Sequence, residues 1–475
     1  MESNQREKKR ARWFQQIAIG VVALLLIAGS VHFYRIHKAQ SRLDQLLAVY
    51  RSRGEPTKVE DLQVPPVPDS ENSAIDIQNA AKILNANIDE SRMLSRIGHA
   101  LPWTTKEKSA AISSLTTFDK ALKYLTLATS RRGLDWRVQL KSPMIEVLLP
   151  NLGNVREISG LATVSAFEAH LRGEDGFALQ HIREIIFLSR SVGKMPGGIV
   201  NSMVSFGLQG AACEAIFNIA AELKINDSDQ TAATRKQVTA LIAELLDEKR
   251  ITEDFRRAMQ GERVWIIDTI ESILENKFRK GTPDPNWTPK LAWFKKADLL
   301  DDARTLAIFD THVIESIDIG NDQAATSYLA PHSAAALESG MLAKFIVPSL
   351  SRAPVSYFRT ITHCRIAATM LAIRLYTVDH LGKPPEKLIE LVPAYLPAIP
   401  GDPMIANQPL KYIPRETDPI LYSVGSNFID DGGKTTPTDP KRSNADSPWS
   451  MLDAVFHYVR PPRDLSDLDE AMKDD

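Results

Sequence analysis

The feature that most constrains this chain is an uncharged stretch near its N-terminus, which runs from Trp13 to Tyr34. Crossing the hydrocarbon core of a membrane takes about 20 apolar residues, and this stretch has that length. Trp13 stands at one end and Phe33 and Tyr34 stand at the other, where amphipathic aromatic rings prefer the membrane interface. The sequence therefore predicts a single transmembrane anchor over residues 13–34, because no later stretch repeats this pattern.

Residues 1–12 form a basic tail in front of this anchor, with five Lys and Arg residues against two Glu residues. The positive-inside rule keeps such a tail in the cytoplasm, so that everything after the anchor lies on the other side of the membrane. The predicted location is the inner membrane of a bacterium, with one pass and with the bulk of the chain in the periplasm or another extracytoplasmic space. The anchor itself makes the membrane the first predicted partner.

Two other interpretations of this segment compete with the anchor. A cleaved signal peptide needs a site of small residues, and Ala28-Gly29-Ser30 is an acceptable one. A buried core helix has the right hydrophobicity, but it does not require a basic flank and aromatic ends.

After the anchor, residues 35–70 divide into two parts. Residues 35–53 continue the anchor as a charged amphipathic helix, and Gly54–Ser70, with four prolines, is typical of a stiff, extended linker. From residue 71 to residue 345 apolar side chains recur at three- and four-residue spacing, which predicts an all-α domain of roughly eight to ten helices. Residues 346–463 read as a small α+β module, and 464–475 as an acidic, disordered tail. The fold class is therefore mainly α, with the middle domain either a helical bundle or an irregular helical repeat.

One helical hairpin is unusually clear in the sequence. A first helix lined by Val155, Ile158 and Phe167 ends near Gly173, and a second helix is lined by apolar and small residues: Phe177, Ala178, Ile182, Ile185, Ile186 and Ser189. The Gly-Asp turn resembles that of a tetratricopeptide hairpin, although the closing proline expected about twelve residues after Ala178 is absent. No second copy follows at a 34-residue period, so a non-repetitive helical bundle is favoured over a helical repeat.

The search for chemistry returns mainly exclusions. The sequence contains no HExxH zinc helix, no GxSxG nucleophile elbow and no complete phosphate-binding loop. His170 and His181 are expected on helix surfaces, away from any metal. A net charge of −2 argues against a protein that coats nucleic acid. Cys213 and Cys364 are too few for a disulfide scaffold, and the sequence alone does not show whether they lie close enough for one bridge.

The C-terminal module carries the one candidate metal site. Pro409–Ile413 fits an edge strand and Ile420–Val424 fits its partner. The loop that follows holds Asn427, Asp430 and Asp431 and then two glycines, a composition that a hard cation such as Ca²⁺ can use. The alternative is an ordinary polar hairpin loop, because Asp-Asp-Gly-Gly is also common turn chemistry.

Three short motifs in order give this module a family resemblance. They are Tyr376–Pro384 at a helix end, Ala398–Pro403 at a turn, and Tyr422–Gly425 before the acidic loop. Together they resemble the globular domain of the major pseudopilins of type II secretion, over about residues 355–460. The resemblance implies a calcium loop in which Asn427 stands where aspartate is usual and Asp453 supplies a late carboxylate. The chain departs from that family at its start, because it has no cleavable leader and no GFTLxE-type assembly helix, so a filament subunit is not favoured.

The layout as a whole looks like that of membrane-anchored bacterial envelope proteins without an assigned activity. The leading hypothesis is a non-enzymatic envelope protein that presents a helical protein-interaction domain outside the membrane. One alternative is an extracytoplasmic hydrolase with dispersed carboxylates, which a pocket joining two carboxyl groups of raised pKa would favour. The other is an accessory component that docks on a secretion or pilus machine through the pilin-like module.

Overall fold

The chain is mainly helical in the computed structural model, which describes residues 2–97, 100–150, 152–275, 277, 294–438 and 447–460. The predicted loop at 281–289 and the predicted tail at 464–475 lie outside these residues. The α-helices span Glu2–Ser52 (α1), Ser73–Ala86 (α2), Ile88–Arg96 (α3), Thr105–Thr129 (α4), Leu152–Leu171 (α5), Asp175–Gly193 (α6), Ile199–Ile219 (α7), Arg235–Leu246 (α8), Glu248–Glu275 (α9), Lys296–Asp318 (α11), Asp322–Ser339 (α12), Ala343–Leu350 (α13) and Ala353–Asp379 (α14). Ten of the described helices lie wholly between residues 71 and 345, within the expected number.

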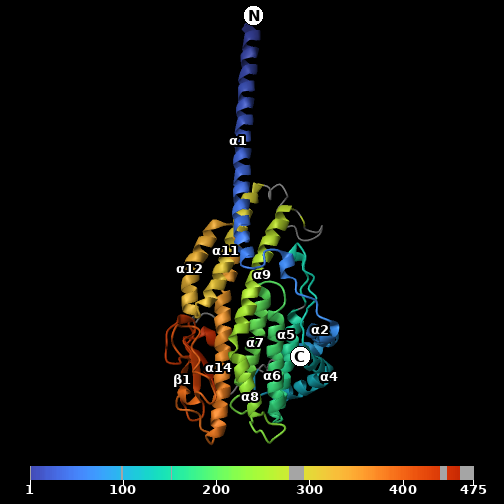
Figure 1. The fold of residues 1–475 in the computed structure, drawn as a ribbon, viewed down its shortest axis with the longest axis vertical. Coiled ribbons are helices and arrows are strands. Elements are labelled where there is room, and N and C mark those ends of the chain that lie inside the picture. Colours follow the sequence, from blue (N-terminus) through green and yellow to red (C-terminus); the bar gives the residue numbers. More distant parts are fainter. Residues whose placement is uncertain are drawn as a thin grey trace.

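Helix α1 is one continuous helix of 51 residues that projects from the body of the molecule (Figure 1). Its apolar segment is exposed along its length, and Leu24, Leu25 and Leu26 each expose about two thirds of their surface. In the described part of the chain, α1 is the one helix long and apolar enough to cross a membrane. The predicted continuation of the anchor into a helix over residues 35–53 is confirmed.

The second half of α1 is part of the body. Ala39, Leu43, Leu47 and Tyr50 are buried in a hydrophobic core shared mainly with α11. Two ion pairs also join α1 to α11. Arg35 lies 2.8 Å from Asp298, and Arg42 lies 3.9 Å from Asp301. The globular part of the chain therefore begins within about two turns of the apolar segment, before the proline-rich linker is reached.

The proline-rich segment after α1 lies along the body. It contains two short 3₁₀ turns, Val59–Leu62 and Asp69–Glu71. Val59 is buried in a small cluster with Leu140, Met144 and Val264. Arg137 holds the end of the segment, because its guanidinium donates to the Val67 carbonyl at 2.6 Å. The segment therefore joins α1 to α2 across the surface of the body.

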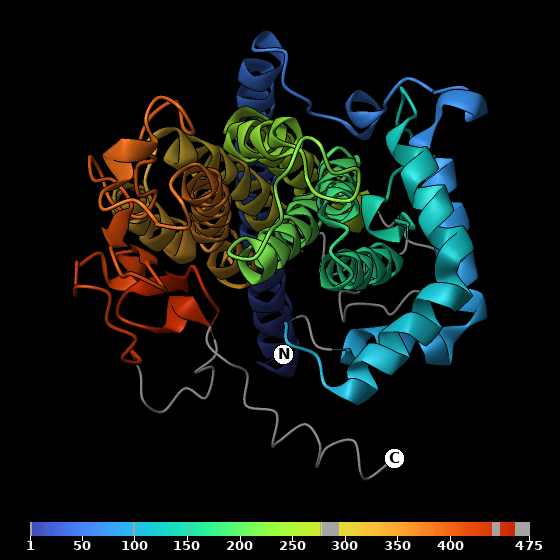
Figure 2. The ribbon, with the colours of Figure 1, turned by 90° about the horizontal axis from the view of Figure 1, so that it is seen from below.

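Two large hydrophobic cores share one helix. The first holds α2 to α8 together with the second half of α14 and the sheet, and the second holds α1, α9 and α11 to α13 together with the first half of α14. Figure 2 shows the sheet and the α2–α4 helices on opposite sides of the body, with the long helices between them. Because α14 spans both cores, the packing is continuous across residues 345 and 346.

A small antiparallel sheet follows α14. Its strands are Lys411–Ile413 (β1), Ile420–Ser423 (β2) and Ala454–His457 (β3), in the order β1-β2-β3. Ile413 pairs with Ile420 and Ser423 pairs with Ala454. Leu421 and Phe456 face the first core, whereas Ile420, Tyr422 and Val455 form a separate outer cluster, as strand alternation requires. The two predicted strands are confirmed, and β3 is an element that the sequence analysis missed.

The hairpin of α5 and α6 is confirmed with one correction. Gly173 has φ of 80°, a left-handed conformation that glycine adopts at little cost where a helix ends. Ile182, Ile185 and Ile186 are buried as expected. Phe177, however, exposes 53% of its surface and lines a surface groove beside α4. The tetratricopeptide likeness itself stays a prediction.

A buried arginine stands where α1 meets α9. The Arg263 side chain is 1% exposed, and its guanidinium donates to Glu55 at 2.6 Å. The same guanidinium lies over the Tyr50 ring, 3.8 Å from the centroid. Asp310 is fully buried nearby, where burial raises its pKa well above the usual value and the charge of Arg263 opposes that rise. Arg263 is thus the central cation of the contact between α1 and the body.

We predict that Arg263→Ala lowers the free energy of unfolding by about 3–5 kcal/mol, because it removes the cation that pairs with Glu55 and that lies near the buried Asp310. Arg256→Ala is the matched control on the same helix, since Arg256 pairs with Asp318 at the surface, at 2.7 Å. That exposed pair contributes about 0–1 kcal/mol to the free energy of unfolding. Chemical denaturation of both variants in detergent measures the difference. Equal decreases in the free energy of unfolding would contradict the role given to Arg263.

Candidate functional site

The acidic loop of the C-terminal module lies between β2 and β3, and Asp453 is its anchor. The Asp453 side chain is fully buried. Its carboxylate accepts backbone N–H groups from Asp431 at 3.2 Å, Gly433 at 2.8 Å and Lys434 at 3.1 Å. Charge-assisted hydrogen bonds of this kind are stronger than neutral ones, so Asp453 closes the loop onto the start of β3.

The other predicted ligands make contacts within the same loop. The Asn427 side-chain amide donates to Asp431 at 2.8 Å, and its oxygen accepts from the Ile429 N–H at 3.0 Å. Asp430 points instead toward the sheet, where it lies 3.1 Å from the Lys411 ammonium. Burial alone would raise the pKa of Asp430, but the lysine, the Gly432 N–H and the Tyr422 hydroxyl together hold it below its usual value.

These contacts test whether the loop suits a cation. Asp431, Asn427 and Asp453 come together, whereas Asp430 is turned toward Lys411. The carboxylates that would bind the ion already accept hydrogen bonds from the chain's own donors. Among the described residues no group of three His, Cys, Asp or Glu side chains is placed to hold a metal. The calcium site therefore stays a prediction, and the chain's own N–H groups suffice to close the loop.

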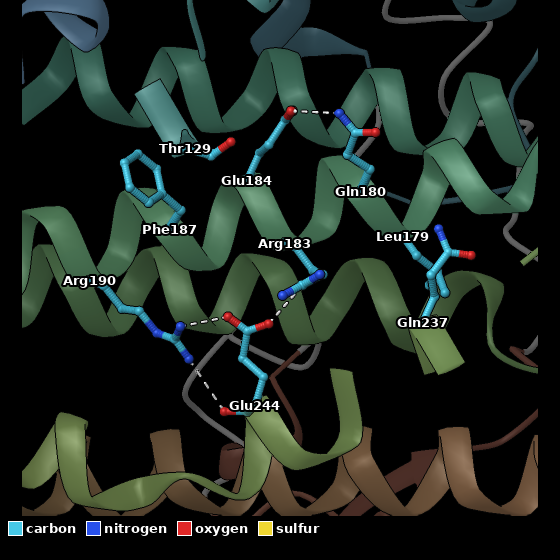
Figure 3. Close-up of a pocket in the computed structure, with 9 residues that line it drawn as sticks. All are labelled: Thr129, Leu179, Gln180, Arg183, Glu184, Phe187, Arg190, Gln237 and Glu244. Carbon is cyan, nitrogen blue, oxygen red and sulfur yellow. Dashed lines mark hydrogen bonds and ion pairs between the residues drawn. The ribbon is translucent and has the colours of Figure 1, made fainter. Parts of the chain in front are cut away.

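The clearest concave polar site on the body is a pocket of about 480 Å³ (Figure 3). We call it the α6–α8 pocket, and its walls come from α6, α8 and the last residue of α4: Thr129, Leu179, Gln180, Arg183, Glu184, Phe187, Arg190, Gln237 and Glu244. Glu244 of α8 lies between two arginines of α6, 2.8 Å from Arg183 and 2.6 Å from Arg190. Arg183 and Arg190 lie seven residues apart, two helical turns, so both reach the same face of α6.

The polar groups of the α6–α8 pocket are tied to one another. Glu184 is 2% exposed and accepts from Thr126 at 2.7 Å and from the Gln180 amide at 3.3 Å. His181 lies 2.8 Å from the same carboxylate. None of the residues that line this pocket is Ser, Cys or Lys. This pocket offers hydrogen-bond donors and acceptors to a partner and resembles a binding surface more than a reaction centre.

A second concavity lies on the neighbouring face. We call it the α4–α6 groove; it has about 630 Å³ and is lined by α4, α5 and the start of α6. Ile112 and Phe177 lie in it with about half of their surface exposed. Apolar side chains inside a polar-rimmed groove are typical of protein-binding surfaces.

The carboxyl groups of raised pKa lie elsewhere. Burial raises the pKa of Asp322 to about 6 and raises those of Glu262, Asp302 and Asp254. Asp254 lines a small pocket between α6, α7 and α9 of about 20 Å³, room for about one water. None of the other carboxyl groups with raised pKa in the described residues lines this pocket, the α6–α8 pocket or the α4–α6 groove. The paired carboxyl groups that a hydrolase would favour do not meet in any of these pockets.

One histidine is placed differently from the prediction. The His170 side chain is only 7% exposed and lies 2.6 Å from Asp175. The other Asp175 oxygen accepts from the Lys224 N–H at 2.7 Å, so His170 belongs to a buried cap that ties α5, α6 and the end of α7 together. Acidic residues at the start of α6 were recognisable in the sequence, but the partner residue 49 positions later was not.

Comparisons with family models, with curated proteins and with solved structures give no match for this chain. Its function is therefore argued from its own residues.

We predict that Asp453→Asn lowers the free energy of unfolding by about 2–3 kcal/mol, because an amide replaces a charged acceptor of three hydrogen bonds. Asp430→Ala, which removes a half-exposed pair with Lys411, should cost no more than about 1 kcal/mol.

Melting the wild-type protein with Ca²⁺, with Mg²⁺ and with chelator tests separately whether the loop binds an ion. A rise with Ca²⁺ alone would establish the predicted site, and identical curves would leave the loop a hydrogen-bonded turn.

Proposed function

We propose that this chain is a single-pass, membrane-anchored envelope protein without enzymatic activity, which presents a helical protein-binding body on the extracytoplasmic side. The observation that supports it best is α1, because one helix carries both an exposed apolar segment and a buried half. Leu24 is 67% exposed, whereas Leu43 is completely buried about five turns along the same helix. Exposed apolar surface of that length needs a membrane, and the buried half needs the body.

The anchor would hold the body directly at the membrane surface. Arg35, the first residue after the apolar segment, is paired with Asp298 in the first turn of α11. The N-terminal end of α11 would then lie level with the lipid headgroups. With no flexible spacer between bilayer and body, the faces that the body offers to a partner would be fixed in orientation.

The orientation across the membrane rests on the basic tail. Five cationic residues in front of the span favour a cytoplasmic N-terminus, which would place α2 to α14 and the sheet outside. In a bacterium with two membranes that space is the periplasm.

A protein partner is the ligand that the surface of the body favours. The α4–α6 groove exposes Phe177 and Ile112 beside the charged Asp119, Glu168 and Arg172. Aromatic and aliphatic anchors with a charged rim are the usual composition of an interface core and rim. The pilin-like resemblance covers about residues 355–460, which include most of α14 as well as the sheet. Helix α14 lies between the two hydrophobic cores, so it would not be free to act as an assembly helix.

We predict that Gln63→Cys reacts with a membrane-impermeant maleimide in intact spheroplasts, because Gln63 is exposed on the proline-rich segment. Cys213 and Cys364 are completely buried, so they should give no background. Ser3→Cys in the basic tail is the matched control and should react only after lysis. Labelling of Ser3→Cys and not Gln63→Cys in intact spheroplasts would contradict the orientation.

For the partner, we predict that Phe177→Glu removes a protein that copurifies with the detergent-solubilised wild type. Ile389→Glu, an equally exposed apolar residue of the C-terminal module, should retain it. Both changes put a charge on the surface, so stability should change little in either. Loss of the partner only with Ile389→Glu would favour docking through the pilin-like module instead.

A further inference from the structure

The chain has two cysteines in 475 residues, and their side chains lie next to each other in the structure. Cys213 is on α7 and Cys364 is on α14, 151 positions later. The two helices pack side by side, and the two sulfur atoms are 4.0 Å apart in the first hydrophobic core. Both side chains are completely buried.

From this juxtaposition we infer that Cys213 and Cys364 form a disulfide bond in the mature protein, which covalently ties α14 to α7. The inference rests on the proposed extracytoplasmic location of the body, because disulfides form and persist in oxidising compartments and are rare in the cytosol. Bond formation would bring the sulfurs to about 2.05 Å. That approach is on the scale of side-chain rotation on two helices already in contact.

The disulfide would close a loop of the chain from Cys213 to Cys364 that contains α8, α9 and α11 to α13. It would attach α14, the helix shared by both hydrophobic cores, to α7. A cross-link across so long a loop restricts the unfolded chain strongly. It would therefore stabilise the joint between the helical body and the C-terminal module.

Burial also fixes when the bond forms. Burial raises the pKa of the Cys213 thiol well above its usual value, and the Cys364 sulfur beside it raises it further. The thiolate is the form that reacts, so the closed core is unreactive and the bond has to form as α7 and α14 come together.

The oxidant is a protein disulfide of the thiol–disulfide oxidoreductase class. One cysteine thiolate of the chain attacks that disulfide, forms a mixed disulfide and releases one thiolate of the oxidant. The second cysteine thiolate then attacks the chain's sulfur in the mixed disulfide and releases the other. Two thiols of the chain lose two protons and two electrons, and one disulfide of the oxidant becomes two thiols.

The test traps the thiols of the full-length wild-type protein in its membrane. Cells are denatured in one alkylating reagent, and the protein is then reduced and treated with a second reagent of different mass. We expect both cysteines to carry the second label. The unreduced digest should contain one cross-linked pair of peptides, two hydrogen atoms lighter than the sum of the free peptides. In Cys364→Ala, Cys213 should carry the first label.

First label on both wild-type cysteines would overturn the inference. Gln63→Cys, labelled in parallel, then shows whether the proposed extracytoplasmic location fails together with the disulfide. If Gln63→Cys reacts in intact spheroplasts, the proposed location still holds. If it reacts only after lysis, the proposed location is wrong as well. Melting gives a second readout that thiol packing alone would not produce. If the disulfide exists, each single variant, Cys213→Ala or Cys364→Ala, should lower the melting temperature by as much as the double variant does. A decrease in the double variant equal to the sum of the two single decreases would contradict the bond.

Discussion

The rest of the structure depends on the burial of the second half of α1. One continuous helix carries the exposed apolar segment, which is a candidate membrane span, and also enters the body. Leu43 and Leu47 supply apolar surface to the core with α11, while Arg263 joins Tyr50 and Glu55 from α9. Apolar burial gives this contact its free energy, and the buried guanidinium adds one ion pair with Glu55 and one ring contact with Tyr50.

Other features of the body are consistent with that joint. The proline-rich segment does not need to span a gap, so it packs over Val59 and Arg137 along the surface. Helix α14 passes between the core that holds α1 and the core that holds α2 to α8, and the sheet packs against its middle, where the rings of His363 and Phe456 are 5.4 Å apart. In the proposed arrangement, an orientation set at the membrane would be transmitted through packed helices to the α4–α6 groove and to the acidic loop.

Local patterns in the sequence predicted the parts of this fold that depend on local physics. The apolar run of 13–34, the helical spacing around Ile182 and Ile186, and strands β1 and β2 are all visible as periodicity and length. Contacts between distant residues were not visible, because nothing near Arg263 indicates Glu55, and nothing near Cys213 indicates Cys364. The candidate loop shows the same division. Its acidic composition could be recognised because the residues are adjacent in the sequence. Asp453 accepts three N–H groups of the loop only because β3 pairs with β2, and β3 (Ala454–His457) was not predicted.

The central claim is that the anchor and the body form one rigid unit. The distance between spin labels at Ser30 in the apolar half of α1 and at Ser327 on α12, measured by pulsed electron resonance in a lipid nanodisc, tests it most directly. Both positions are exposed on helices of the described structure. A rigid joint predicts one narrow distance distribution. A broad distribution, as a flexible tether between membrane and body would give, would contradict the account.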